Sequence, residues 1–573
     1  MPNLLAMSFE GELAPCFDLR CLHPGSTRTP DGWGLGYYPG GEPSASVLKE
    51  PAPPHGSIRS ELVKAWEHLE ASLFVLHIRT ATWGAISDAN TQPFSRSYAG
   101  RDWLFSHSGS LRHRLERSSS KDLFEPIGST DSERVFCELL AYFAERGWRS
   151  IGDADPVAVR SFFERLGAHG NMSSVLTDGR DLLAYADVHG EGHLHLGTIR
   201  PPYDKLVLED ADLLLDFGRR GVEAQKGVVV ASNPLEGAGA TWKSLSPGHL
   251  LVVRQGALIV DMPPGATIGE RSTGRDLQRP APVEPRRLSI VHRTSYRYDK
   301  PVERSSHLLR LTPAHDRLQT LHACDITLSV DGKMRDYDDV FGNRARKVVI
   351  EQSYTELVIE ARSEVSLLDT EPFGLRPFHA RSTIPLVWMP WQRQVLQPYL
   401  LPPELPETQL DVLARYAMTF VERNDYDLVD TLFDLNQTIF RDYLYQKGST
   451  SLSTTPYEVY TRRTGVCQDF ANLFICLARL LSVPARYVCG YLYTGPKHPN
   501  HTMAEASHAW VQVYLPEVGW KGFDPTSGVY TQTDHVRVAA GRSYVDATPT
   551  SGTIYVGGAR ETLDVAVHVT PIL

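Results

Sequence analysis

The chain has 573 residues, more than one hydrophobic core usually supports, so we expect two or more domains. Its 42% hydrophobic and 22% charged residues are typical of a globular protein. The net charge is −10 with both signs spread along the chain, which argues against nucleic acid as the main partner, because phosphate binding needs a concentrated basic face. The sequence has no membrane-length apolar run and no secretory leader pattern, so we expect a cytoplasmic protein without a membrane partner.

The seven cysteines are scattered and odd in number, and no two of them form a CxxC pair. This usage fits a reducing compartment better than a disulfide framework or a zinc site. We therefore expect neither a metal nor another cofactor.

Residues 1–261 alternate short strand-like runs with helical ones. Apolar residues recur at three- and four-residue spacing in residues 131–146 (DSERVFCELLAYFAER) and 157–166, as they do on the buried face of a helix. We expect an α+β layered domain. Its clearest strands are predicted at residues 73–78, 175–176, 182–185 and 228–231.

Residues 262–287 (MPPGATIGERSTGRDLQRPAPVEPRR) are expected to be a linker, because they are rich in Pro, Gly and Arg and have no apolar periodicity. Residues 288–370 change character: short alternating runs are separated by turn signals, which predicts an antiparallel β-sandwich. The runs are residues 296–298, 309–312, 326–330 and 348–351, and the turn signals are VDG at 330–332 and FGN at 341–343.

Residues 371–573 begin with a helical pattern. One apolar stripe predicts a helix that ends near residues 447–448, and a second helix is expected at Cys467. Strands are then expected at residues 486–493 and 509–514. The stripe of the first helix consists of Leu428, Leu432, Leu435 and Ile439.

The stretch TGVCQDFA (464–471) places Cys467 at the start of its helix, where Gly465 can supply the unusual backbone angles of a sharp entry. A thiol in the first helical turn faces unpaired backbone N–H groups and the positive end of the helix dipole. Both favour the thiolate, which is the nucleophilic form. A lone cysteine at a helix start is more often a small buried residue, and we expect that role for Cys476 and Cys489. The buried face of the helix is marked by Phe470, Phe474, Leu477 and Leu481.

Two later segments offer partners for this thiol. His508 lies in the strand-like run SHAWVQVY (507–514), and Asp524 lies in GWKGFDPT (519–526). On neighbouring antiparallel strands Asp524 can fix the tautomer of His508, whose other nitrogen then faces the sulfur. Cys467 would attack an amide carbonyl, His508 would carry a proton to the leaving amine, and Asp524 would stabilise the imidazolium.

The ordered set GVCQDFA, ASHAWVQVY and GWKGFDPT resembles the bacterial transglutaminase-like family, in which Cys, His and Asp occur in this order. VPARYVCGYL (483–492) is similar to the segment between Cys and His in that family, and HRTSYRYDKPV (292–302) resembles the β-sandwich that precedes its catalytic core. The resemblance implies a papain-like transglutaminase core that acts as a cysteine protease or acyltransferase. It implies Cys467, His508 and Asp524 as the catalytic residues.

Six segments before the linker carry a second resemblance: DGWGLGYY (31–38), HIRTATWG (77–84), NTQPF (90–94), HSG (107–109), STDSE (129–133) and VVVASNPL (228–235). They are similar to the glutaminase domain of class II glutamine amidotransferases. That domain has the N-terminal-nucleophile fold, so the resemblance implies an αββα sandwich for residues 1–261.

In that family a cysteine follows the initiator methionine and uses its own amine as the base, but here the residue is Pro2. Ser108 replaces the Asn of the family's His-Asn-Gly oxyanion motif, before Gly109. Arg79 matches the residue that clamps the glutamine α-carboxylate, and Asp131 matches the one that pairs with the α-amine. The resemblance implies a pseudo-glutaminase without ammonia release. Its pocket either still binds glutamine or a γ-glutamyl-like group, or is a structural remnant.

Hypotheses of different classes remain open for the whole chain. The first is hydrolysis or acyl transfer at peptide, isopeptide or glutamyl amide bonds, with the choice between water and amine set by the shape of the cleft. The second is a non-catalytic binding or scaffold protein built from two enzyme-like domains. In a third, the first domain recognises a glutamyl or amide substrate and delivers it to the thiol site. The sequence predicts neither the natural substrate, nor the oligomeric state, nor the second oxyanion donor.

Overall fold

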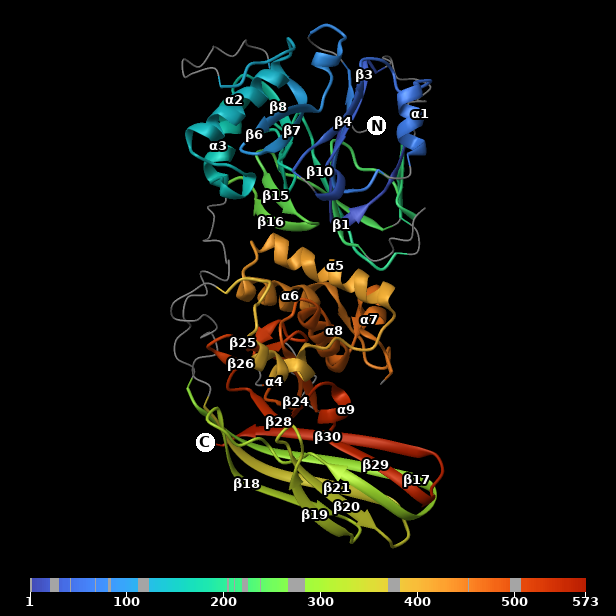
Figure 1. Ribbon diagram of the computed structural model, residues 1–573. Coiled ribbons are helices and arrows are strands. Elements are labelled where there is room, and N and C mark those ends of the chain that lie inside the picture. Colours follow the sequence, from blue (N-terminus) through green and yellow to red (C-terminus); the bar gives the residue numbers. More distant parts are fainter. Residues whose placement is uncertain are drawn as a thin grey trace. The chain divides into compact units, whose positions relative to one another are not determined.

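The computed structural model divides the chain into two compact units, Met1–Arg271 and Ser272–Leu573 (Figure 1). Pro2 and residues 266–283 of the predicted linker lie outside the described residues. No helix within the described ranges is long and apolar enough to cross a membrane. The structure describes residues 3–20, 30–41, 43–66, 69–80, 84–111, 123–203, 206–210, 212–218, 225–237, 239–265, 284–368, 382–451, 453–494 and 507–572.

In the first unit one antiparallel sheet packs face to face on another. The first sheet runs in the order β14 (Ala240–Ser244), β10 (His195–Ile199), β13 (Gly227–Ala231), β1 (Leu4–Leu13), β5 (Ala71–Arg79), β3 (Gly32–Tyr37) and β4 (Ser46–Glu50). The second runs in the order β16 (Ala257–Met262), β15 (Leu250–Arg254), β9 (Asp181–Tyr185), β8 (Gly170–Thr177), β7 (Arg101–Leu111) and β6 (Phe94–Tyr98).

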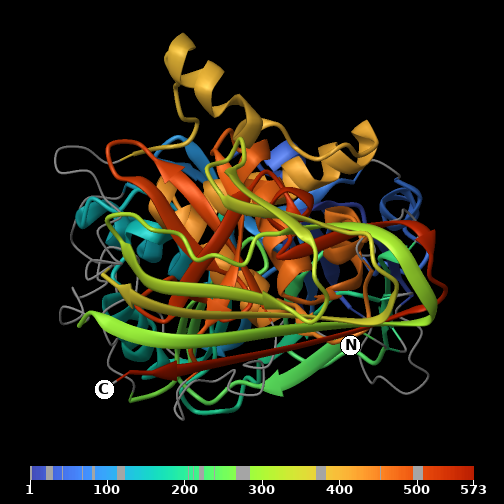
Figure 2. The same ribbon diagram turned by 90° about the horizontal axis from the view of Figure 1, so that it is seen from below.

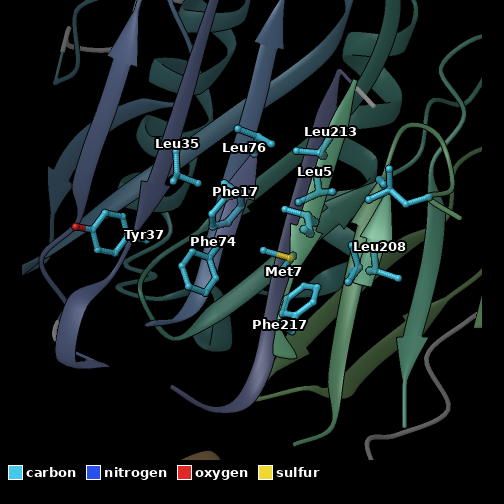
Figure 3. Packing of buried hydrophobic residues seen from close by; sticks show 14 of the residues in the cluster. Leu5, Met7, Phe17, Leu35, Tyr37, Phe74, Leu76, Leu208, Leu213 and Phe217 are labelled. Carbon is cyan, nitrogen blue, oxygen red and sulfur yellow. The ribbon is translucent and has the colours of Figure 1, made fainter. Parts of the chain in front are cut away.

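Strand β1 shows why the sheets stack. Successive side chains of a strand point to opposite faces, and β1 is apolar on both. Leu4 and Ala6 belong to the cluster between the two sheets, whereas Leu5 and Met7 face the outer layer. Figure 3 shows Leu5 and Met7 beside Phe74 in that outer cluster.

Each sheet is covered on its outer face. Helices α2 (Asp131–Glu145) and α3 (Pro156–Gly167) cover the second sheet through their apolar stripes. The first sheet is covered by α1 (Ile58–Ala65) together with a small sheet, and Figure 1 places α1 on the opposite side of this unit from α2 and α3. The predicted αββα class is confirmed, with one outer layer mixed. The small sheet runs β11 (Val207–Glu209), β12 (Leu213–Asp216) and β2 (Cys16–Leu19), and 3-10 helices occupy Pro39–Gly41, Asp88–Asn90 and Ile151–Asp153.

The second unit contains the predicted sandwich, organised by one long strand, β17 (Arg286–Leu309). The first part of β17 pairs with β21 and β30, and its last part pairs with β20 and β29. In Figure 2 the yellow-green β17 and the red β30 run side by side. The sandwich thus includes residues 550–571, which the sequence placed with the catalytic core. The other strands are β18 (Gln319–Leu328), β19 (Lys333–Asp338), β20 (Arg344–Ile350), β21 (Tyr354–Leu367), β29 (Thr550–Gly557) and β30 (Glu561–Pro571).

The rest of the second unit is a layer of helices on an antiparallel sheet. The sheet runs β27 (Val529–Tyr530), β26 (Gly519–Asp524), β25 (His508–Leu515), β24 (Ala485–Leu492) and β28 (His535–Gly541). The helices are α4 (Pro390–Leu400), α5 (Glu407–Arg423), α6 (Leu428–Asp442), α7 (Pro456–Arg462), α8 (Cys467–Leu480) and α9 (Tyr544–Ala547). Helix α8 packs on β24 and β25, which buries the predicted stripe. A cluster that includes Leu288, Tyr491, Val536 and Val567 joins this layer to the sandwich.

Helix α6 buries the predicted stripe but ends at Asp442, so the predicted end near residues 447–448 is wrong. The chain becomes extended at β22 (Leu444–Tyr445), which pairs in parallel with β23 (Thr464–Gly465). Backbone hydrogen bonds to these neighbouring residues replace those of another helical turn. This pairing lies directly before the start of α8.

Candidate active site

Cys467 is the first residue of α8, as predicted. The preceding residue, Val466, is extended and its N–H donates to Asp469 Oδ2 at 2.8 Å. Thr450 Oγ1 donates to the same oxygen at 2.6 Å. An acidic side chain near the end of the first turn is a favourable cap for the exposed amides of a helix start. Asp469 thereby ties the start of α8 to a separate loop.

The predicted reason for Gly465 is wrong, because its φ is not positive. The left-handed residue is Arg463, with φ 53°. Instead, a glycine is required at position 465 because neighbouring side chains leave no room for a larger residue. A Cβ atom there would lie 2.9 Å from Asp469 Cβ and 3.1 Å from Phe470 Cε1. The glycine therefore lets the chain pass close to the first turn of α8.

His508 and Asp524 lie on neighbouring antiparallel strands, β25 and β26, as predicted. His508 Nε2 lies 2.9 Å from Asp524 Oδ2, and the two side chains are 6% and 0% exposed. Asp524 Oδ1 accepts a hydrogen bond from the N–H of Thr526 at 2.9 Å. Because His508 Nε2 contacts Asp524, Nδ1 is the ring nitrogen that can interact with the thiol.

The charges at this site favour an imidazolium beside a carboxylate. Burial alone would lower the pKa of His508, but the charge and hydrogen bond of Asp524, with a hydrogen bond to Cys467, raise that pKa to about 10. Burial works to raise the pKa of Asp524, yet His508 holds it well below its usual range. The structure therefore brings Cys467, His508 and Asp524 into one connected cluster.

The other thiols of this layer differ from Cys467. Cys467 is half-buried, whereas Cys476 in α8 and Cys489 in β24 are buried. Burial raises the pKa of each of these two thiols to about 12. Both stay protonated at neutral pH, which fits the structural role expected for them.

His535, at the start of β28, joins the cluster and was missed by the sequence analysis. Its Nε2 lies 3.3 Å from Asp524 Oδ2, and its Nδ1 lies 2.6 Å from Asp534 Oδ1. A possible signal was the Asp-His pair just before an alternating run. The placement could not be predicted, because β28 pairs with β24 and not with its sequence neighbour β27.

A metal could also be considered at this cluster. Within the described part of the chain, His508, Asp524 and His535 place one ligand-type atom each within 4.8 Å of one another. Both imidazoles contact the same carboxylate oxygen at hydrogen-bond distances, which accounts for the clustering, and we assign no metal.

Two residues of the predicted glutamine pocket lie at element ends in the first unit. Arg79 is the last residue of β5 and is buried, and its Nη2 donates to the carbonyls of Gly84 and Ala85 at 3.4 and 3.2 Å. Asp131 is the first residue of α2, and its Oδ2 accepts from the N–H of Leu111 at 2.8 Å. Both side chains therefore help to hold the local backbone.

Ser108 and Gly109 lie on β7, opposite Ser173 and Met172 of β8. Gly109 has a φ of 148°, and a Cβ there would lie 2.2 Å from the carbonyl oxygen of Asn171, so the position requires glycine. The backbone conformation and packing thus explain the glycine at position 109 without any role in glutamine binding.

Comparison with known proteins gives matches to both parts of the chain. The family described as "Glutamine amidotransferases class-II" matches residues 1–273. "Bacterial transglutaminase-like N-terminal region" matches residues 288–366, and "Transglutaminase-like superfamily" matches residues 414–525. The chain is 33% identical over 254 residues to "Putative glutamine amidotransferase YafJ" of Escherichia coli (strain K12), covering 44% of this chain and 96% of YafJ.

The chain belongs to the class-II glutamine amidotransferases. Its residues 288–366 and 414–525 match the two transglutaminase-like family models. We call residues 1–273 the amidotransferase half and residues 288–573 the transglutaminase-like half. The match to the transglutaminase-like superfamily supports thiol-dependent enzymatic activity in general terms.

Two further matches have similar coverage. "Uncharacterized protein Rv2569c" of Mycobacterium tuberculosis (strain ATCC 25618 / H37Rv) is 33% identical over 299 residues, covering 50% of this chain and 93% of that protein. Among solved structures, a "Putative Cysteine Protease" from Cytophaga hutchinsonii is 20% identical with a TM-score of 0.42, covering 51% of this chain and 92% of the other.

Proposed function

We propose that the transglutaminase-like half hydrolyses amide bonds, or transfers their acyl groups, through Cys467, His508 and Asp524. The observation that carries the proposal is the buried contact of 2.9 Å between His508 Nε2 and Asp524 Oδ2, beside a thiol at a helix start. Cys467 lies at the positive end of the α8 dipole and beside the His508 imidazolium, which are surroundings typical of a catalytic cysteine. A nucleophile, a proton carrier and an orienting carboxylate are the three parts that acyl transfer needs.

The reaction proceeds in two steps. The Cys467 thiolate attacks the amide carbonyl, and His508 gives its Nδ1 proton to the leaving nitrogen as the C–N bond breaks, which leaves a thioester. The neutral imidazole then takes a proton from water or an amine as that molecule attacks the thioester. The C–S bond breaks, and the thiolate and imidazolium are restored. Asp524 stays ionised throughout, because its pKa lies well below its usual range.

The substrate class that we propose is a peptide, an isopeptide or a glutamyl amide in a protein or peptide. Hydrolysis is the first choice, and transfer to an amine is the second. Both use the same thioester, so they are distinguished by the acceptor and not by the triad.

The experiment is an amide turnover screen with the full chain. Peptide and γ-glutamyl amides are incubated with the unmodified protein, Cys467→Ala and Cys476→Ala, with and without an added amine. We expect turnover by the unmodified chain, none by Cys467→Ala and nearly full turnover by Cys476→Ala, whose thiol is buried away from the site. Turnover that survives in Cys467→Ala would contradict the proposal.

We further propose that the amidotransferase half releases no ammonia from glutamine, because Pro2 supplies no thiol. The contacts of Arg79 with two carbonyls and of Asp131 with a backbone N–H support a structural role for both residues. Calorimetry with glutamine tests the pocket. We expect no binding heat in the unmodified chain, and heat that disappears in Asp131→Asn would establish a working pocket.

A further inference from the structure

His535 lies beside the proposed triad and has no part in the mechanism above. Its side chain is 1% exposed. Its Nδ1 lies 2.6 Å from Asp534 Oδ1, and its Nε2 lies 3.3 Å from Asp524 Oδ2. A carboxylate only accepts hydrogen bonds, so the imidazole makes both contacts as hydrogen bonds only when both nitrogens carry protons. The geometry therefore fits an imidazolium cation between two carboxylates.

Asp524 is shared between two imidazoles. His508 Nε2 and His535 Nε2 approach the same oxygen, Oδ2, at 2.9 and 3.3 Å, and the ring centroids are 6.3 Å apart. The other oxygen, Oδ1, accepts a hydrogen bond from the N–H of Thr526. The carboxylate is thus held on both oxygens, and its charge is divided between two rings.

The groups around His535 support its positive charge. Within the described residues, the titratable groups that face it are Asp534 on the preceding turn, Asp524 on β26 and His508 on β25. Burial lowers the pKa of His535, but Asp534 and Asp524 raise it to about 9. Farther along β28, Arg537 donates to the two carboxylate oxygens of Asp316 at 2.6 and 2.7 Å.

Two further neighbours of His535 carry no charge. Leu492 is its register partner on β24. The Trp510 ring lies edge-on with its centroid 5.2 Å away. Neither side chain supplies a counter-charge, and the carboxylates of Asp534 and Asp524 are the groups that favour the protonated ring.

We propose that His535 is a positioning residue, a buried cation that shares Asp524 with His508 and limits how tightly Asp524 holds the His508 proton. The inference rests on the proposed function. An imidazolium on the far side of the carboxylate weakens the attraction that the His508 imidazolium feels. His508 therefore gives its proton to the leaving amine more readily, while Asp524 stays ionised and oriented.

The first test is a titration of histidine-labelled full-length chain by NMR, which needs no substrate. It compares the unmodified chain with His508→Gln, Asp534→Asn and the matched control His322→Gln, whose imidazole is exposed on β18. We expect His535 to be doubly protonated near pH 7.5. His508 still carries its charge while His535 titrates near pH 9, so we expect His508→Gln to raise the pKa of His535 by about one unit. Two unit charges about 6 Å apart repel each other appreciably even at an effective dielectric constant of about 20.

His508→Gln and Asp534→Asn change the surroundings of His535 in opposite ways. His508→Gln removes a neighbouring positive charge, whereas Asp534→Asn removes a neighbouring negative charge and keeps the size of the side chain. We expect Asp534→Asn to lower the pKa of His535, and His322→Gln to leave it unchanged. A neutral His535 near pH 7.5, or a His535 titration that neither variant moves, overturns the inference.

The second test is the pH profile of amide turnover. Near pH 7.5, where both imidazoles are charged, His535→Gln should lower kcat about tenfold with little change in KM, because a more basic imidazolium is a weaker acid. Near pH 10, where His535 is mostly neutral, the turnover of the variant should approach that of the unmodified chain. A folded variant whose kcat near pH 7.5 is unchanged overturns the inference. Turnover that persists in Cys467→Ala overturns the proposed function instead, and the titration above still decides the charge of His535.

Discussion

At the scale of single residues, the charges of the thiol site meet at Asp524. Both His508 and His535 approach one of its oxygens, and the buried carboxylate remains ionised. Asp524→Asn keeps the size of the side chain and removes its charge. The amide nitrogen can also face His508 Nε2 and stabilise the wrong tautomer.

We expect Asp524→Asn to lower kcat by about 10³- to 10⁴-fold with a small change in KM, as for loss of the orienting carboxylate in other triads. Steady-state kinetics on the best amide from the turnover screen measures this. Asp411→Asn is the control, because Asp411 is an exposed carboxylate on α5. A loss of less than about tenfold would mean that the carboxylate does not orient the proton carrier.

In the proposed mechanism, the protonation of His508 sets the alkaline limit of activity. Asp524 raises its pKa to about 10 against the effect of burial, so the imidazolium is present below about pH 10 and lost above it. We expect kcat/KM to fall as the pH rises through about 10, measured on chain that circular dichroism shows to be folded. A decline centred below about pH 8 would contradict this assignment.

Residue order and type were enough to predict part of the site. Cys467 begins a helix, and His508 and Asp524 lie on adjacent strands, which the pattern and the family resemblance both indicate. His535 could not be predicted, because its partner Asp524 lies across a sheet whose strand order departs from sequence order. The reason for Gly465 was also predicted wrongly. The glycine is needed because Asp469 and Phe470 pack against it, and that packing depends on the folded chain.

At the scale of elements, the start of α8 determines where the thiol points. Asp469 accepts from the N–H of Val466 and from Thr450 Oγ1, and so joins the helix to a loop. We expect Asp469→Ala to cost about 1 kcal/mol of unfolding free energy, as for loss of a helix cap. Because the cap sits beside the thiol, we also expect a clear loss of kcat.

Urea unfolding and amide kinetics measure the two effects together. Asp411→Ala is the control, since an exposed carboxylate on α5 should change stability by less than about 0.5 kcal/mol. Full activity and unchanged stability in Asp469→Ala would show that the start of α8 does not depend on this cap.

Local periodicity predicted the elements well where one face is buried. Helix α2 and strands β5, β9 and β13 lie where the apolar patterns indicated. The end of α6 was missed because a parallel pairing between β22 and β23 replaces its next turn. Strands β29 and β30 carry no local sign that they pair with β17, which lies more than two hundred residues earlier. Such pairings depend on the whole fold and not on local pattern.

At the scale of the whole molecule, the described residues place Cys467, His508 and Asp524 together in one half of the chain, whereas residue 2 of the amidotransferase half is a proline. In the class-II family a cysteine at this position supplies both the nucleophile and, through its amine, the base. Pro2 has no thiol, and the resemblance implies that Ser108 stands in place of an oxyanion donor. We therefore propose that the two halves differ in the chemistry that they perform.

We expect Cys467→Ala chain to release no ammonia from glutamine above the uncatalysed rate, because this variant removes the thiol of the other half. A coupled assay for free ammonia measures this, with a class-II glutaminase of known activity as the positive control. Steady release from the Cys467→Ala chain would contradict the pseudo-glutaminase proposal.

Alkylation of the intact chain by iodoacetamide, read by peptide mass spectrometry, tests the thiol site most directly. Cys324 is the matched control, because it is half-buried like Cys467 but lies in the sandwich. We predict that Cys467 reacts first near neutral pH, ahead of Cys324 and of the buried Cys476 and Cys489, and that His508→Ala slows it. Equal labelling of these cysteines, or a Cys467 rate that His508→Ala leaves unchanged, would contradict the account.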